Sequence, residues 1–104
     1  MEVYTIDIDG TLCDEEPVRQ YERHKPTIEK HFAMIAKINK HYDEGDLIKI
    51  FTARGSSSGK DWRDLTEKQL KDWGVKYHVL IMGKPSSDWF VDDRNMSIKE
   101  FLGE

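Results

Sequence analysis

The sequence has little cysteine and no long apolar segment. Cys13 is the only cysteine among 104 residues, so an internal disulfide and a cluster of thiolate metal ligands are excluded. No apolar run approaches the roughly 20 residues that a membrane-spanning helix needs, and the first residues lack the basic-then-apolar pattern of an export signal. We therefore expect a cytoplasmic protein with no membrane partner, in which Cys13 is an ordinary loop thiol.

Basic residues are in the minority as well. Sixteen Lys and Arg residues against twenty Asp and Glu residues give a net charge of −4, and a negatively charged protein repels polyanions. Nucleic acid is therefore disfavoured as a partner. A hydrophobic content of 38% over 104 residues suits one modest core, so we expect a single domain spanning residues 1–104.

Strand-like and helix-like segments alternate along the chain. Short runs of β-branched and aromatic residues predict strands, and apolar residues repeating every three or four positions predict helices that end at glycine. The expected strands are Val3–Ile8, Leu47–Phe51, Tyr77–Met82 and Trp89–Val91. The expected helices lie between Pro26 and Gly45, with Ile28, Phe32, Ile35, Ile38 and Tyr42 facing inward, between Asp61 and Gly74, and over Ser97–Leu102.

This alternation predicts an α/β fold, namely a Rossmann-like three-layer domain around a central, mainly parallel sheet of four to five strands. Such sheets bind their ligands outside the carboxyl ends of the strands. Six residues with useful side-chain chemistry follow the expected strand ends, which places them at one edge of the sheet. They are Asp7, Asp9, Thr52, Lys84, Asp92 and Asp93.

The types of residue at this edge indicate phosphoryl chemistry. Several carboxylates close together repel one another unless a hard cation lies among them, and oxygen-rich sites of this kind suit Mg²⁺. The cation and Lys84 would neutralise a phosphoryl group, Thr52 and backbone amides would hold its oxygens, and a carboxylate would attack phosphorus. Each of these residues taken alone is also an ordinary strand-end turn residue.

Taken together, four segments resemble the motifs of the haloacid dehalogenase superfamily in their usual order. The segments are DIDGTL from Asp7 to Leu12, IFTAR around Thr52, GKP at Lys84, and FVDDR at Asp92 and Asp93. The resemblance covers nearly the whole chain, and DxDGT after a first strand is a specific signal. It implies a magnesium-dependent hydrolase that cleaves phosphomonoesters through an aspartyl-phosphate.

The resemblance also implies a role for each motif residue. Asp7 would be the nucleophile and a metal ligand, and Asp9 would be the general acid and base and would give its backbone carbonyl to the metal. Thr52 and Lys84 would hold the phosphoryl group. An aspartate at the position of Asp9 is typical of the phosphatase branch, since that acid is absent from the dehalogenases and ATPases.

The remaining site residues follow from the same motifs. Asp92 would complete the magnesium shell, with Asp93 as a further metal-side partner. Gly10, Ala53 and Arg54 lie beside the motif residues and are predicted to bind phosphate or substrate.

No segment is long enough to form the separate cap domain that the superfamily usually carries. A loop from Thr11 to Pro26 and a turn from Gly55 to Lys60 stand in its place, so the chain resembles small capless phosphatases of surface-polysaccharide and sugar-nucleotide pathways. The expected substrate is a phosphorylated sugar or related small metabolite, with a neighbouring subunit of a homo-oligomer as one way to cover the site. The candidates to contact the leaving group are Arg19, Arg23, His24, Lys25 and Arg54.

Three alternatives stay open at this point. The same residues would serve a phosphotransferase or mutase, or a phosphatase acting on nucleic-acid ends. A signalling receiver domain also has a phosphorylated aspartate and a Lys-Pro, but its acidic pair comes before the phosphoacceptor.

The segment GSSSGK from Gly55 to Lys60 is not a nucleotide-binding P-loop, because one spacer residue is missing and Asp61 follows the lysine. Trp62, Trp73 and Trp89 are expected to pack in the core.

Overall fold

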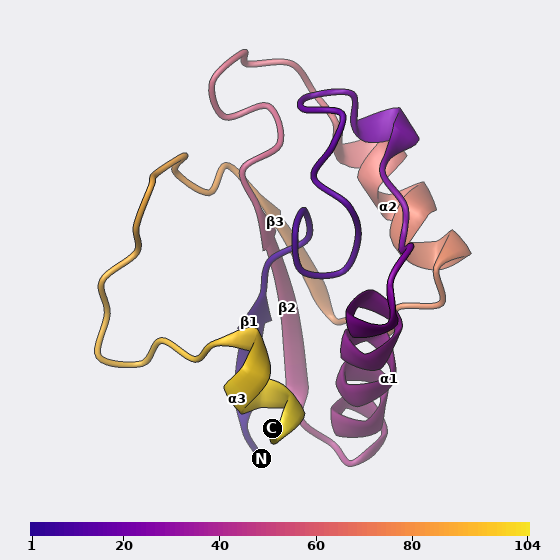
Figure 1. The fold of residues 1–104 in the computed structure, drawn as a ribbon, viewed down its shortest axis with the longest axis vertical. Helices are drawn as coiled ribbons and strands as arrows, with labels where there is room; N and C mark the ends of the chain where they lie inside the picture. Colours follow the sequence, from indigo (N-terminus) through magenta and orange to yellow (C-terminus); the bar gives the residue numbers. More distant parts are fainter.

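The computed structural model describes all 104 residues and shows three parallel strands in one open sheet (Figure 1). The strands β1 (Val3–Ile6), β2 (Leu47–Thr52) and β3 (Val79–Met82) lie in the order β1-β2-β3. The helix α1 (Glu29–Asp43) connects β1 to β2, α2 (Arg63–Asp72) connects β2 to β3, and α3 (Ile98–Leu102) ends the chain. A short 3₁₀ helix, η1 (Tyr21–Arg23), interrupts the loop before α1. The α/β class is confirmed.

Alternating burial along the strands shows which face of the sheet holds the core. In β2, Ile48, Ile50 and Thr52 are buried and the residues between them are only partly covered. The side chains of successive strand residues point to opposite faces, so one face of β2 is the core face. Truncating a fully buried residue such as Ile50 to alanine would cost about 2–5 kcal/mol of stability.

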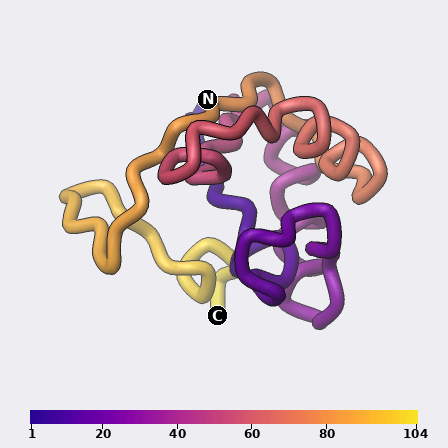
Figure 2. The backbone as a smooth tube through the Cα atoms, turned by 90° about the horizontal axis from the view of Figure 1, so that it is seen from above, coloured from indigo at the N-terminus to yellow at the C-terminus, as the bar shows by residue number.

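All three helices pack on that same face. The ring of Phe101 in α3 lies edge-on to Tyr4 of β1 with the ring centroids 5.3 Å apart, and 5.4 Å from His41 of α1. Viewed along the strands, the sheet forms one side of the molecule (Figure 2). On its other face Val3 and Val79 keep 50% and 41% exposure. The domain therefore has two layers, and the expectation of three is wrong.

The first helix was predicted correctly, but its inward face differs from the predicted one. His31, Met34, Ile35 and Ile38 are buried, whereas Phe32 is mostly exposed. His31 takes the inward place because its Nδ1 accepts hydrogen bonds from backbone N–H groups at the start of the helix, including that of Thr27 at 3.1 Å. A polar residue can thus occupy the buried stripe when it satisfies the unpaired amides of a helix end.

The fourth strand expected at Trp89–Val91 does not form. Trp89 and Val91 are 85% and 98% exposed, and local side chains take the place of a sheet ladder: Asn95 donates from Nδ2 to the carbonyl of Phe90 at 3.2 Å. Three apolar residues between polar flanks are too few to compete with such turns. The sheet therefore has three strands instead of four to five, and Trp89 does not join the core.

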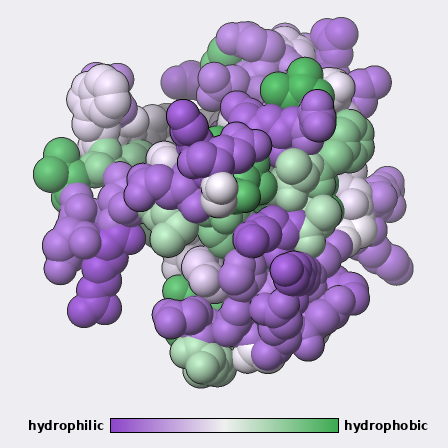
Figure 3. All heavy atoms as spheres, turned by 60° about the horizontal axis from the view of Figure 1, so that its bottom comes forward, coloured by the Kyte–Doolittle hydropathy of each residue, from purple (hydrophilic) through white to green (hydrophobic).

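The segment from residue 83 to 97 leaves β3, projects from the body of the domain and returns to α3 near the N-terminus (Figures 1 and 2). Seen with the bottom of the molecule forward, the surface is mostly hydrophilic, with smaller apolar areas between charged side chains (Figure 3). None of the helices combines the length and apolar character that crossing a membrane requires.

Candidate active site

A cavity of about 480 Å³ lies beyond the carboxyl ends of the strands, where the sheet topology predicts a ligand. Its wall is rich in ionisable groups from three separate parts of the chain. The acids are Asp7, Asp9, Glu15 and Glu16, the bases are Arg54 and Lys84, and the remaining lining residues are Val18, Tyr21, Ala53, Pro85, Ser86, Ser87 and Phe90.

Asp7 and Lys84 lie next to each other in the wall of this cavity. Lys84 Nζ lies 3.7 Å from Asp7 Oδ1, and the Asp7 side chain keeps 38% exposure. The backbone N–H of Lys84 donates to the carbonyl of Thr52 at 2.9 Å, which ties the segment after β3 to the end of β2. Burial raises the pKa of Asp7, and the charge of Lys84 only partly opposes that effect. Asp7 is thus a reachable carboxylate beside one cation.

Asp9 has a different environment. Arg54 donates from Nε to Oδ2 at 3.0 Å and from Nη2 to Oδ1 at 2.8 Å, so the carboxylate lies in the fork of the guanidinium. Burial alone would raise the pKa of Asp9, but the hydrogen bonds and charge of Arg54, together with those of His24, outweigh it and lower that pKa. Asp9 is therefore ionised in the resting protein.

His24 holds the other side of Asp9. Its Nδ1 lies 2.7 Å from Asp9 Oδ1, and its Nε2 lies 2.8 Å from the carbonyl oxygen of Pro17. Both neighbours are hydrogen-bond acceptors and a neutral imidazole carries one N–H, so the tautomer of His24 decides which of the two contacts is the hydrogen bond. His24 is also 3% exposed, so the imidazole is buried, while the Asp9 side chain keeps 20% exposure toward the cavity.

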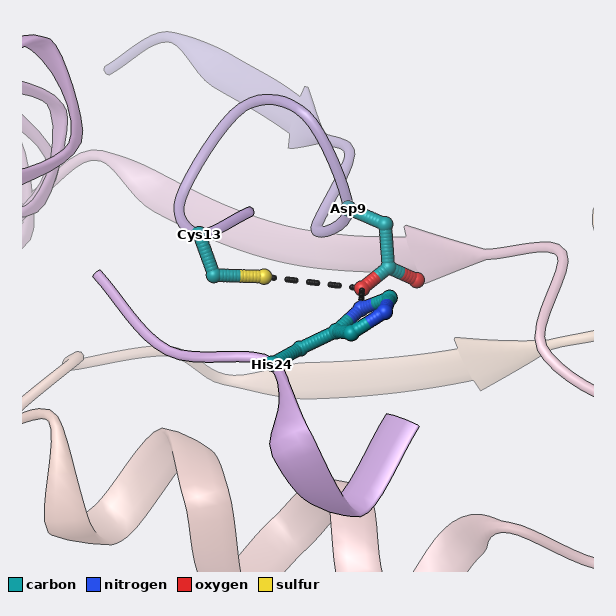
Figure 4. A group of neighbouring side chains, drawn as sticks. All are labelled: Asp9, Cys13 and His24. Atoms are coloured by element: carbon teal, nitrogen blue, oxygen red, sulfur yellow. Dashed lines mark hydrogen bonds and ion pairs between the residues drawn. The ribbon is translucent and has the colours of Figure 1, made fainter. Parts of the chain in front are cut away.

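Figure 4 shows the cluster of Asp9, Cys13 and His24, in which the thiol and the imidazole point to the same carboxylate. The Sγ of Cys13 lies 3.5 Å from Asp9 Oδ1. Burial raises the pKa of this thiol far above its usual range, and a protonated thiol is a poor metal ligand. Since Arg54 already neutralises Asp9, we interpret the cluster as a hydrogen-bonded support and not as a metal site.

The structure places some predicted residues below the cavity instead of in its wall. Thr52 is 1% exposed, and its hydroxyl accepts a hydrogen bond from the backbone N–H of Arg54 at 3.2 Å. The N–H of Gly10 donates to the carbonyl of Cys13 at 3.0 Å, and the two following amides donate to the carbonyl of Ile8. These amides are used inside the turn, while Ala53 and Arg54 do reach the cavity.

Asp92 and Asp93 lie outside the cavity. Both are exposed on the projecting segment, and Asp92 Oδ1 accepts from the backbone N–H of Arg94 at 3.1 Å. The structure therefore brings Asp7, Asp9, Arg54 and Lys84 together but does not bring the second acidic pair to them.

Sequence reasoning missed several cavity residues. Glu15, Glu16 and Tyr21 come from the loop between Thr11 and Pro26, and Phe90 lies with its ring 4.4 Å from Lys84 Nζ. The length of that loop was a signal that it serves the site, but its path depends on buried contacts made by His24. Arg54 was expected to contact substrate and lines the cavity, and its side chain is in addition buried against Asp9, Thr66 and Gln69.

The oxygen donors at the strand ends suit a magnesium ion in kind. The carboxylate of Asp7 faces the cavity, and the backbone carbonyl of Asp9 accepts no hydrogen bond within the chain. Mg²⁺ commonly takes one or two protein carboxylates and completes its shell with water and phosphate oxygens. Asp7 and the carbonyl of Asp9 therefore fit such an ion without a contribution from Asp92.

Comparison with known proteins supports the fold. No protein-family model and no curated protein matches the chain. The crystal structure of an MCSG target from Vibrio cholerae is similar, with a TM-score of 0.84 and 24% identity, over 100% of this chain and 89% of that one. At this identity the likeness concerns the fold alone, and it shows that this small α/β arrangement occurs in an experimentally determined structure.

Proposed function

We propose that the protein is a magnesium-dependent phosphomonoester phosphatase of the haloacid dehalogenase type that forms an aspartyl-phosphate on Asp7. The observation that carries the proposal is the pair of Asp7 and Lys84, 3.7 Å apart and facing a cavity that Asp9 also lines. A carboxylate beside a cation at the carboxyl edge of a parallel sheet is suited to attack a phosphoryl group while the cation holds its oxygens. The order of the motifs from Asp7 to Asp93 agrees with this assignment.

The proposed reaction has two steps. In the first, Asp9, which is ionised at rest, takes up a proton from the acid form of the substrate phosphate; an Asp7 oxygen then forms a bond to phosphorus while the bond to the leaving oxygen breaks, and Asp9 passes the proton to that oxygen. In the second, Asp9 takes a proton from water, whose oxygen displaces Asp7 and releases inorganic phosphate. Lys84 offsets the charge of the phosphoryl oxygens in both steps. A magnesium ion held by Asp7 and the Asp9 carbonyl would supply further charge neutralisation.

The two aspartates differ in exposure and in how their carboxylates are held. Asp7 is accessible, and Lys84 is its cationic neighbour, whereas both carboxylate oxygens of Asp9 are oriented by Arg54 and His24. A fixed orientation is what a proton-transferring group needs. The nearest group able to exchange a proton with Asp9 is His24, at 2.7 Å.

The finer expectations belong to this proposal. The phosphoryl-binding role of Thr52, the metal-binding roles of Asp92 and Asp93, the capless Rossmann-like class, the cytoplasmic location, a homo-oligomeric assembly and a small phosphorylated metabolite as substrate all stay predictions. The acidic wall of the cavity supports a small substrate over nucleic acid, because Glu15 and Glu16 would repel a polyanion beyond the reacting phosphate.

The test is release of inorganic phosphate from sugar phosphates, nucleotides and 3′-phosphorylated oligonucleotides, with magnesium and with a chelator, for the wild type and Asp7→Asn. The proposal expects turnover that needs both magnesium and Asp7. Transfer of the phosphoryl group to an added alcohol in place of release would favour the phosphotransferase. Stable phosphorylation of Asp7 by a small phosphodonor, without turnover of any ester, would favour the receiver.

A further inference from the structure

A second cavity, of about 260 Å³, adjoins the candidate active site. Tyr21, Ala53 and Ser86 line both cavities, so the two share one dividing wall. The second cavity lies over the serine-rich turn, with Gly55, Ser57 and Ser58 in its lining. A substrate that places its phosphoryl group beside Asp7 could therefore extend its leaving group along this wall.

The charge of the second cavity is opposite to that of the first. Its charged lining residues are Arg19 and Lys60, with no carboxylate among the others, whereas four carboxylates line the candidate active site. Neither Arg19 nor Lys60 forms an ion pair with an acid of the chain. Two cations without an acidic partner in one concave site favour an anionic ligand group.

Aromatic residues orient one of these cations. Lys60 Nζ lies 4.3 Å from the centre of the Trp62 ring, and Trp62 packs edge-on against Tyr21 at 5.1 Å. Because the ammonium covers a face of Trp62, that face is not open for stacking with a nucleobase. The second cavity therefore suits a charged ligand group better than a nucleobase.

The backbone at the other cation is also unusual. Arg19 has a φ of 62°, and it is the only residue other than glycine with positive φ. Residues other than glycine adopt this left-handed conformation infrequently, and those that do occur often at ligand sites.

We propose that this second cavity binds an anionic group on the leaving part of the substrate, through Arg19 and Lys60. Resting on the proposed phosphatase activity, the inference narrows the substrate class to phosphomonoesters that carry a second negative group, a carboxylate or another phosphate. The phosphoryl group to be cleaved lies at Asp7 and Lys84, and the second anion lies between Arg19 and Lys60. A neutral alcohol would leave both cations without a partner.

The experiment compares kcat/KM for matched substrate pairs. Glycerol 2-phosphate is paired with 2-phosphoglycerate and glucose 6-phosphate with 6-phosphogluconate, which tests a carboxylate. Fructose 6-phosphate is paired with fructose 1,6-bisphosphate, which tests a second phosphate. In each pair that the protein hydrolyses, we expect kcat/KM to be about tenfold to a hundredfold higher for the member with the second anionic group, which is the size of one or two charge-assisted contacts.

Variants connect this preference to the cavity. The double variant Arg19→Gln with Lys60→Ala should reduce the ratio of kcat/KM between substrates with and without the second anionic group to near one, mainly through KM. Lys60→Arg should retain most of the preference. Lys68→Ala, an exposed lysine of α2 paired with Asp72, is the matched control and should leave the ratio unchanged. The arm that shows the larger ratio identifies the anion as carboxylate or phosphate.

The outcomes separate this inference from the proposed function. Turnover with equal kcat/KM for substrates with and without the second anionic group overturns the anion site and leaves the phosphatase proposal intact. A preference that the double variant retains also overturns it. Failure to release phosphate from any compound overturns the phosphatase and, with it, this inference.

Discussion

Arg54 donates hydrogen bonds to both carboxylate oxygens of Asp9, from Nε to Oδ2 at 3.0 Å and from Nη2 to Oδ1 at 2.8 Å. Its remaining terminal nitrogen donates to Thr66 at 3.1 Å and to Gln69 at 2.6 Å, both in α2. One buried guanidinium therefore connects the turn after β1, the end of β2 and the second helix. This connection makes the orientation of Asp9 depend on the packing of the whole domain.

We expect Arg54→Ala to destabilise the protein by about 3–5 kcal/mol, because it leaves the buried side of Asp9, Thr66 and Gln69 without a partner. Arg54→Lys should recover only part of the loss, since an ammonium group cannot make the two-pronged contact. Urea unfolding measures both. A double-mutant cycle with Asp9→Asn checks the cause: additive losses would show that the pair is not coupled.

Stability should depend on pH through Asp9. The pKa of this carboxyl is lowered on folding, so its contribution is fully present above the unfolded pKa of about 3.9 and is lost as the pH falls through the folded value. The difference in urea midpoint between wild type and Asp9→Asn should therefore be largest near neutral pH and shrink below about pH 4. A difference that stays constant from pH 7 to pH 3 would contradict this view of the pair.

Asp7→Asn should separate activity from stability. Because burial raises the pKa of Asp7, its ionised form is disfavoured on folding, and stability from this group is lost as the pH rises above about 3.9. The amide removes that cost, so thermal unfolding at neutral pH should occur at the same temperature or slightly higher. Phosphate release should fall at least about a thousandfold, as expected on removal of a nucleophile. A large drop in unfolding temperature would instead assign Asp7 a structural role.

His24→Ala should release the loop that covers the site. The ring connects Asp9 to the carbonyl of Pro17, and its loss should cost about 2–4 kcal/mol through a buried cavity and broken hydrogen bonds. Trypsin should then cut faster after Arg19 and Arg23. His41→Ala is the control. His41 forms a comparable pair with Asp46, in which Nδ1 lies 2.8 Å from Oδ2, and this pair is not part of the site. Equal cleavage in both variants would refute the anchoring role of His24.

Two glycines of the serine-rich turn should respond differently to alanine. A Cβ on Gly55, at φ +80°, would overlap the carbonyl oxygen of Lys60, whereas one on Gly59, at φ +72°, meets nothing within 4 Å. Gly59→Ala should cost about 1 kcal/mol from backbone conformation alone, and Gly55→Ala distinctly more. Thermal unfolding of the two variants measures the difference, and similar losses would mean that the turn adapts freely.

Local pattern was sufficient for most of the secondary structure. The glycines after the two long helices and the β-branched runs of the three formed strands predicted those elements to within a few residues. The local sequence pattern failed at Trp89–Val91, because a strand there needs a neighbouring strand to pair with and no short-range pattern indicates whether one is available. It also failed at Phe32, where helix-end hydrogen bonding placed His31 inward instead.

The chemistry of the site divides in the same way. The residue types and their order after strand ends, above all Asp7, Asp9 and Lys84, were readable from sequence because parallel strands bring their carboxyl ends to one edge. That Arg54 binds Asp9, that His24 contacts the same carboxylate, and that Asp92 lies apart were decided only by tertiary structure. Such roles depend on which charged groups share a buried volume, since burial makes each one require a partner, and that information is not local in the chain.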